Sequence, residues 1–229
     1  MRRLLYWLSR ALGLFILVSI VATVVYGTVP PPVTPLMIIR LFEGEGLSKD
    51  WVSYGSISPN LVRAVIASED AKFCSHHGFD WDAIKKAWSR NQTSKRLKGG
   101  STISQQTAKN VFLWPDRTYL RKSLEFYFTA LIEIFWSKKR VIEVYLNVVE
   151  FGHGIYGAEA AAQAYFGKPA TALSRREAAL LAAVLPNPLR WSAGKPTAYI
   201  RSRATTIQAR MNDVPDPTDD PCARAATSE

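Results

Sequence analysis

The chain has 229 residues, 48% of them hydrophobic and seven of them Trp, which is enough apolar material for one compact domain with a substantial core. Its net charge of +10 favours an anionic partner, but no nucleic-acid-binding motif occurs, so we expect anionic lipid or a phosphate-bearing substrate and no nucleic acid. Three His and two Cys at this spacing do not support a Cys/His metal site.

The N-terminal segment differs in composition from the rest of the chain. After Arg2, Arg3 and Arg10, residues 11–29 form an almost unbroken apolar run, just long enough to cross a hydrocarbon core of about 30 Å as a helix. A buried core helix would carry a polar face, and a cleaved signal peptide would have a shorter run and a small-residue cleavage site. We therefore predict one uncleaved transmembrane helix, with residues 1–10 in the cytoplasm because the basic residues precede the run.

Three further segments follow the predicted membrane helix. Four prolines in TVPPPVTP disfavour a helix or a central strand, so we predict an extended stem over residues 30–40. Residues 41–212 lack sustained strand alternation and are predicted to form a mainly α-helical domain. Residues 213–229 mix proline with acidic residues and are predicted to form a disordered tail. Because Cys74 lies in an apolar segment and Cys222 in this tail, we do not expect a disulfide between them.

The segment VIASEDAKFCSHHGFD, residues 65–80, places two adjacent carboxylates in a pattern typical of a buried helix. On a helical wheel Glu69 shares a face with Val65 and Ile66, while Asp70 lies about 100° away. Loss of hydration raises the pKa of a carboxyl group, so Glu69 is a candidate general acid or base. A buried ion pair with an Arg that joins two helices explains the position equally well.

The residues after this carboxylate pair have structural interpretations. We expect Asp70 and His76 to act as hydrogen-bond partners that fix the turn at Gly78. Tryptophan and basic residues then recur at helical spacing, which is typical of a membrane-surface helix, although core packing of the apolar residues is as plausible. The residues concerned are Trp81, Ile84 and Trp88, with Lys85, Lys86 and Arg90 nearby.

The segment KGGSTISQQTAKN, residues 98–110, predicts a helix start. Gly99 and Gly100 allow unusual backbone angles, and Thr102 with Gln105 fits a capping box. Such a start presents unpaired amide groups to an anion, although a tight turn with a cap is the commoner meaning of the pattern. Side-chain donors follow at Gln105, Gln106, Lys109 and Arg117.

Residues 119–152 predict another helical region, in which Leu124 and Phe128 belong to a core stripe. Glu125 lies between that stripe and the basic pair Arg121 and Lys122. It is either half of an ion pair with Arg121 on a solvated face or a second carboxylate in the same cleft as Glu69.

Taken in order, these motifs resemble the family 51 glycosyltransferases, which polymerise the glycan strands of peptidoglycan. EDAKFCSHHG is similar to the family's E-D-x-x-F-x-x-H-x-G, and GGSTISQQTAKN to its G-G-S-T-I-[ST]-Q-Q-x-x-K-N. RKSLE and SKKRVIEVYLN resemble R-K-x-x-E and K-x-x-I-L-E-x-Y-L-N, and residues 173–191 resemble the fifth block. The resemblance covers about residues 45–210, and five motifs in order are specific to this family.

The resemblance implies a helical, lysozyme-like fold with a periplasmic cleft at the cytoplasmic (inner) membrane, and lipid II and the growing lipid-linked glycan as substrates. Glu69 matches the general base, and Glu125 matches an assisting carboxylate. Lys109 and Arg117 match residues that contact the substrate diphosphate. The residues that match the remaining parts of that site are Ser101, Gln105 and Gln106, with structural support from Asp70, Phe73, His76, Gly78, Gly99 and Gly100.

The resemblance also leaves choices open. A divalent cation, Mg²⁺ or Mn²⁺, is an option at the diphosphate, with ligands unknown. We expect no transpeptidase activity. The alternatives are a glycan-cleaving lysozyme-like enzyme and a non-catalytic membrane-tethered scaffold for other wall-synthesis or division proteins. The donors between residues 99 and 117 favour transfer from a diphosphate over cleavage of a glycan.

Overall fold

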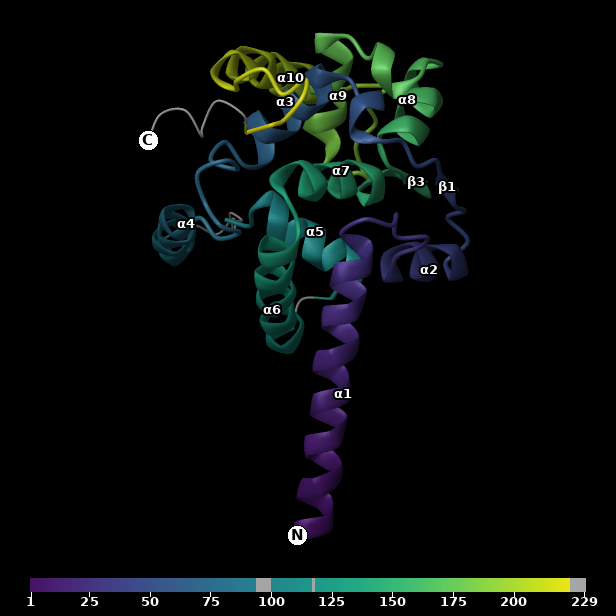
Figure 1. Ribbon diagram of the computed structural model, residues 1–229. Helices are drawn as coiled ribbons and strands as arrows, with labels where there is room; N and C mark the ends of the chain where they lie inside the picture. Colours follow the sequence, from purple (N-terminus) through teal and green to yellow (C-terminus); the bar gives the residue numbers. More distant parts are fainter. Residues whose placement is uncertain (94–99, 117, 223–229) are drawn as a thin grey trace.

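The computed structural model describes residues 1–93, 100–116 and 118–222 (Figure 1). Gly99 and Arg117, both expected at the site, therefore lie outside the described residues. The α-helices in the described part are α1 (Arg2–Tyr26), α2 (Pro35–Phe42), α3 (Pro59–Glu69), α4 (Trp81–Thr93), α5 (Ile103–Phe112), α6 (Tyr119–Phe135), α7 (Lys138–Val148), α8 (Ala158–Phe166), α9 (Arg175–Val184) and α10 (Ala198–Arg210). The prediction of a mainly α-helical chain is confirmed.

A small sheet and three short 3-10 turns complete the described architecture. The sheet has the order β1-β3-β2, with β1 parallel and β2 antiparallel to β3. Its strands are β1 (Ser48–Lys49), β2 (Glu150–Gly152) and β3 (Ile155–Tyr156), and the 3-10 turns are η1 (Tyr54–Ser56), η2 (Ala170–Ala172) and η3 (Met211–Asp213). Because the strands are so short, the sheet only joins the chain before α3 to the hairpin after α7.

Two groups of helices form the body of the protein. In one group α3 packs against α9 and α10, and in the other α5 packs against α6 and α7 (Figure 1). One continuous apolar core joins the groups, and its large fully buried side chains include Leu61, Ile103, Ile142, Tyr145 and Leu181. The C-terminal end of α3 and the helix α5 therefore meet at the boundary between the two groups.

The helix α1 extends from the body, and its C-terminal half lies alongside α6 (Figure 1). It is long and apolar enough to cross a membrane, as predicted for residues 11–29, although it ends at Tyr26. Its contact with α6 is specific, because Ser19 Oγ lies 2.6 Å from the Tyr127 hydroxyl and Trp136 Nε1 donates to the Thr23 carbonyl at 2.7 Å. The apolar helix is thus fixed to the body by polar contacts.

The prediction of an extended stem over residues 30–40 is wrong for its second half, where α2 forms. Pro35 occupies the first turn of α2, where its missing N–H is not needed and its fixed backbone angle suits a helix. Thr34 caps this turn by accepting from the Met37 amide, and the Met37 side chain is fully buried. Residues 30–34, before α2, contain neither helix nor strand.

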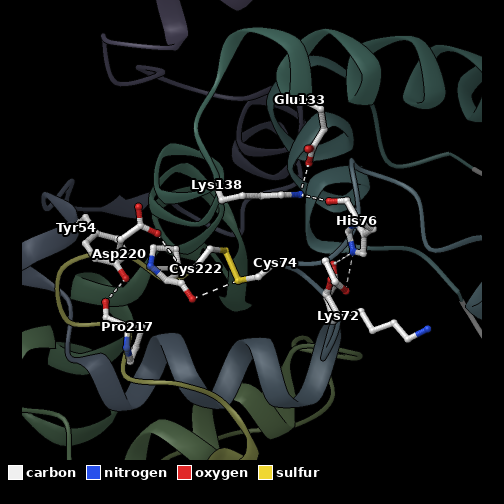
Figure 2. The surroundings of a disulfide bond; sticks show 12 residues. Tyr54, Lys72, Cys74, His76, Glu133, Lys138, Pro217, Asp220 and Cys222 are labelled. Atoms are coloured by element: carbon white, nitrogen blue, oxygen red, sulfur yellow. Dashed lines mark hydrogen bonds and ion pairs between the residues drawn. A yellow bond between two sulfur atoms is a disulfide. The ribbon is translucent and has the colours of Figure 1, made fainter. Parts of the chain in front are cut away.

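The expectations of a disordered tail and of no disulfide are both wrong for residues 213–222. Cys74 and Cys222 form a disulfide with 5.3 Å between their Cα atoms. The Tyr54 hydroxyl donates a hydrogen bond to the Pro217 carbonyl (Figure 2). The segment has no apolar periodicity because carbonyl contacts and one covalent bond hold it, so composition gave a misleading signal.

Candidate active site

A cavity of about 390 Å³ lies where α3, α5 and α6 meet. Five of the expected site residues lie in its wall, although they come from separate segments of the chain: Glu69, Ser101, Gln106, Lys109 and Glu125. The other residues of the wall are Pro115, Asp116, Arg121, Lys122, Leu185 and Pro186. Glu69 and Glu125 thus line the same cavity, which is one of the two placements that the sequence left open for Glu125.

Glu69 is the last residue of α3, and its carboxylate is only partly exposed in the cavity wall. Burial raises the pKa of Glu69, and the nearby charge of Asp70 adds to the effect. The hydrogen bond from Gln106 and the charges of Arg203 and Lys109 act in the opposite direction. Within the described part of the chain Glu69 forms no ion pair, so the alternative of a structural Arg–Glu pair is not supported. A raised pKa suits a carboxylate that accepts a proton near neutral pH.

Gln106 connects this carboxylate to the core. Its Nε2 donates to Glu69 Oε2 at 3.1 Å, and its Oε1 accepts from the Tyr145 hydroxyl at 3.1 Å. Tyr145 is fully buried, and burial together with the charge of Glu69 raises its pKa well above the ordinary value, so its hydroxyl stays protonated and donates. Tyr145 therefore sets the orientation of the Gln106 amide. Only the tyrosine in the VYLN motif could have indicated this role from the sequence.

The start of α5 differs from the expected anion-binding helix start. The capping box is confirmed, because Thr102 Oγ1 accepts from the Gln105 amide and Gln105 Oε1 accepts from the Thr102 amide. The amide of Ile103 donates to Asp70 Oδ2 at 3.0 Å. These three amides are therefore paired with the protein's own side chains. Gln105, expected to bind substrate, is buried within the cap and is not among the described residues that line the cavity.

Asp70, His76 and Gly78 have the structural surroundings that the sequence predicted. His76 Nε2 lies 2.9 and 3.0 Å from the two carboxylate oxygens of Asp70. Thr102 Oγ1 donates to the Gly78 carbonyl at 2.6 Å. Gly78 has a φ of +83°, and a Cβ there would lie 2.8 Å from Cγ of Glu133. The loop after Glu69 is thus fixed against the start of α5.

Phe73 and Gly100 provide packing around this loop. Phe73 is fully buried, and Lys138 Nζ lies 4.8 Å from the centre of its ring while donating to the His76 carbonyl at 2.7 Å. A Cβ on Gly100 would lie 3.1 Å from the carbonyl oxygen of Ala83 in α4, so this position requires a small residue. Both support the site without lining it.

The helix α4 is the segment predicted to lie on the membrane surface. Trp81 is 61% exposed and Lys85 and Lys86 are exposed, whereas Ile84 is half-buried. The side chains of Trp88 and Arg90 lie outside what the structure describes. The exposure of Trp81 favours a surface position over core packing for this residue, and the function of the helix remains a prediction.

Part of the cavity wall is basic. Glu125 accepts from Arg121 Nη1 at 2.6 Å and also pairs with Lys122, and both Arg121 and Glu125 are buried. The expected i,i+4 ion pair thus exists, but it lies in the cavity wall rather than on a solvated face. Lys122 Nζ also donates to Ser101 Oγ at 3.4 Å, and burial lowers the pKa of Lys109. Arg121 was not expected in the site, although the RKSLE motif contains it.

The residues present do not fit a divalent cation held by the protein. Among the described residues no three His, Cys, Asp or Glu side chains gather closely enough to bind a metal ion. Arg121 and Lys122 already occupy the two oxygens of Glu125. No chemical step proposed below therefore uses a metal.

A larger hollow of about 440 Å³ lies elsewhere, near η3 and the start of α9. Its two arginines are already engaged, because Arg63 pairs with Asp216 at 3.4 Å and Arg175 donates to Asn212 Oδ1 at 2.6 Å. None of the expected site residues lines this hollow, so the smaller cavity is the better candidate for chemistry.

The cavity at Glu69 combines a partly dehydrated carboxylate with a group of cationic side chains. Comparison of the sequence with known protein families agrees with this arrangement. The family model described as transglycosylase matches residues 37–212. The chain belongs to the transglycosylase family. The match includes the whole cavity wall, from Glu69 to Pro186.

Transglycosylases similar to the chain cover nearly its whole length, and the three described here are named biosynthetic peptidoglycan transglycosylase. The protein from Rhodospirillum centenum is 58% identical over 210 residues, which are 91% of each chain. That from Caulobacter vibrioides is 56% identical over 207 residues, 90% of each chain, and that from Pseudomonas putida is 51% identical over 216 residues, 92% of each chain. The likeness therefore extends over at least nine tenths of the chain.

Proposed function

We propose that the protein is a peptidoglycan glycosyltransferase that polymerises lipid II into linear glycan strands, releases undecaprenyl diphosphate and has no transpeptidase activity. The observation that carries the proposal is the cavity itself. Glu69, which has a raised pKa and no ion-pair partner among the described residues, lines the same cavity as Lys109, Arg121 and Lys122. The carboxylate suits a base, and the cationic side chains suit a diphosphate.

In the proposed reaction Glu69 accepts the proton of the 4-hydroxyl group of the acceptor sugar. The hydroxyl oxygen forms a bond to the anomeric carbon of the lipid-linked donor, and the bond between that carbon and the diphosphate oxygen breaks. The electron pair leaves with the diphosphate. A sugar hydroxyl is a weak nucleophile, so a dehydrated carboxylate within hydrogen-bond reach accelerates this step by about 10²- to 10⁴-fold.

The basic wall supplies what the leaving group requires. A diphosphate stabilises its own departing charge, so it needs cations and donors more than a proton donor. We assign this role to Lys109 and to Lys122, with Ser101 beside them and Arg117 as the expected fourth contact. Glu125 assists by holding Arg121 and Lys122 in position. A glycan-cleaving enzyme would instead need a carboxylic acid near the leaving oxygen.

The contact between α1 and α6 supports a site beside the membrane. α6 carries both Glu125 and Tyr127, which bonds to Ser19 in the apolar helix. We propose that α1 is a single-pass anchor in the inner membrane, with its N-terminus in the cytoplasm and the catalytic domain in the periplasm. The basic residues before the apolar run support this orientation. We also propose that the protein binds partners among the wall-synthesis or division proteins.

The test is to incubate purified full-length protein with lipid II and to separate the products by length. We expect long glycan strands from the wild type and a loss of at least about a hundredfold in kcat from Glu69→Gln. Glu43→Gln, which changes an exposed carboxylate outside the cavity wall, is the matched control and should keep its activity. Equal polymerisation by Glu69→Gln would exclude the role of this residue, and shortening of preformed glycan would indicate the cleaving alternative.

A further inference from the structure

The only disulfide of the chain attaches the loop that follows Glu69 to the C-terminal segment. Cys74 lies in the loop between Asp70 and Gly78, and Cys222 ends the described part of the chain, 148 positions later. Figure 2 shows the disulfide between the segment that carries Pro217 and Asp220 and the loop that carries His76.

The loop needs external support, because α3 ends at Glu69. Asp70 already has a non-helical φ of −160°, and residues 70–80 contain only turns and bends. Hydrogen bonds hold one side of the loop. The Asp70 carboxylate accepts from the amide of Ile103 and contacts His76 Nε2, and Lys138 donates to the His76 carbonyl. The disulfide attaches this loop covalently to the C-terminal segment.

The C-terminal segment is itself fixed to the body, so the disulfide connects the loop to a stable support. Tyr54 donates to the Pro217 carbonyl, and Arg63 of α3 donates to the Pro215 carbonyl at 3.4 Å. Arg63 also pairs with Asp216 at 3.4 Å. The C-terminal segment therefore runs along α3, the helix that carries Glu69.

The segment also covers the back of the last turn of α3. Ile66, one turn before Asp70, is 3% exposed and lines a small cavity of about 60 Å³ together with Val214, Pro215 and Pro221. Loss of the segment would expose this turn to water. The carboxylate at its end would then lose part of its apolar surroundings.

We propose that Cys74 and Cys222 are positioning residues for glycosyl transfer: their disulfide holds the loop after Glu69 against the C-terminal segment and so keeps Glu69 in the geometry required of the base. This inference rests on the proposed function of Glu69. The cysteines act through the loop and do not touch the substrate.

The experiment compares full-length wild type, wild type reduced with a phosphine, and the variant Cys74→Ala/Cys222→Ala. Free thiols are counted to show that the disulfide is broken, and circular dichroism confirms that the protein is folded at the assay temperature. Tyr54→Phe is the matched control, because it removes one contact of the C-terminal segment and keeps the disulfide.

We expect kcat for lipid II to fall about threefold to tenfold when the disulfide is broken, with a smaller change in KM, because a small displacement of a base lowers the rate of chemistry more than substrate binding. We also expect the acidic limb of the pH–rate profile to move down by about half a pH unit or more, because better hydration lowers the pKa of Glu69. Tyr54→Phe should remain within about twofold of the wild type.

A second readout does not depend on activity. The pKa of Glu69 is measured by carbon NMR of its carboxyl group in the oxidised and reduced protein, with Glu69→Gln used to assign the signal. Failure of the oxidised wild type to polymerise lipid II would overturn the proposed function, while the NMR shift would still test the positioning. Unchanged kcat, pH profile and carboxyl signal in a folded, reduced protein would overturn the inference. Unfolding of both the variant and the reduced protein would also overturn it, because the disulfide would then serve the whole fold.

Discussion

The side-chain amide of Gln106 donates to Glu69 Oε2 at 3.1 Å, and the same amide is held through its oxygen by the Tyr145 hydroxyl. Burial raises the pKa of Glu69, and this hydrogen bond lowers it by favouring the charged form. If Glu69 is the base, as proposed, its activity at a given pH therefore depends on a residue that takes no proton itself.

Gln106→Ala should move the acidic limb of the kcat/KM profile to higher pH by about half a unit to one unit, because the carboxylate loses a donor. The sign follows from the mechanism: only deprotonated Glu69 accepts a proton, so a higher pKa means less active enzyme at low pH. The rate of lipid II polymerisation, measured from about pH 4 to about pH 9, gives the position of the acidic limb. Gln163→Ala on α8, outside the cavity wall, is the control, and a shift to lower pH would contradict the prediction.

Arg203 on α10 is a second influence on Glu69. Its charge lowers the pKa of Glu69 against the larger effect of burial, and its buried Nε has no hydrogen-bond partner in the described part of the chain. Arg203→Gln should therefore also move the acidic limb to higher pH, by about half a unit. Arg201→Gln removes an exposed charge two residues away on the same helix and should leave the limb in place. Equal shifts in both variants would indicate a general effect of net charge.

Lys109→Met separates substrate binding from folding. Burial lowers the pKa of Lys109, so its charged form is poorly solvated and its replacement by an apolar side chain of similar length should leave Tm unchanged or higher. The same change removes a charge-assisted contact worth roughly 1.5–3 kcal/mol, so kcat/KM for lipid II should fall about tenfold to a hundredfold. Lys86→Met at an exposed position is the control. A marked fall in Tm would return Lys109 to a structural role.

Gly78→Ala should destabilise the loop after Glu69 for two reasons that can be separated. The φ of +83° costs an L-residue about 1–2 kcal/mol, and the new Cβ would also lie 2.8 Å from Cγ of Glu133. Gly44 has the same φ but open space around it, so Gly44→Ala measures the backbone cost alone. We expect a larger loss of unfolding free energy at Gly78 than at Gly44, measured by urea denaturation. Equal losses would show that Glu133 moves aside at no cost.

Local patterns predicted much of α3, which carries the proposed base Glu69, and of α5, which contacts it. The apolar stripe through Val65 and Ile66 indicated the buried face of α3, and the capping box fixed the start of α5, because both features depend on residues close together in the sequence. The raised pKa of Glu69 followed from the same stripe.

Contacts between distant segments could not be predicted in this way. The segment that ends at Cys222 showed no periodicity because its carbonyl groups and one sulfur hold it, and neither leaves a repeating pattern. Arg203 reaches Glu69 from α10, far along the chain, and no local pattern connects the two. The amide of Ile103, expected to be free at the start of α5, is paired by Asp70, whose loop no local pattern could place.

The contact between Ser19 and Tyr127 has a consequence for how the enzyme would meet the proposed lipid-linked substrate. A helix joined by a loose linker would let the catalytic domain change its height and tilt above the bilayer. Here Ser19 and Thr23 bond to side chains of α6 and of the residue that follows it, so the depth of Glu125 is set by side-chain packing and not by linker length. With α1 as the proposed membrane anchor, the cavity would be held at one level, and the proposed lipid-linked diphosphate would reach it by lateral diffusion alone.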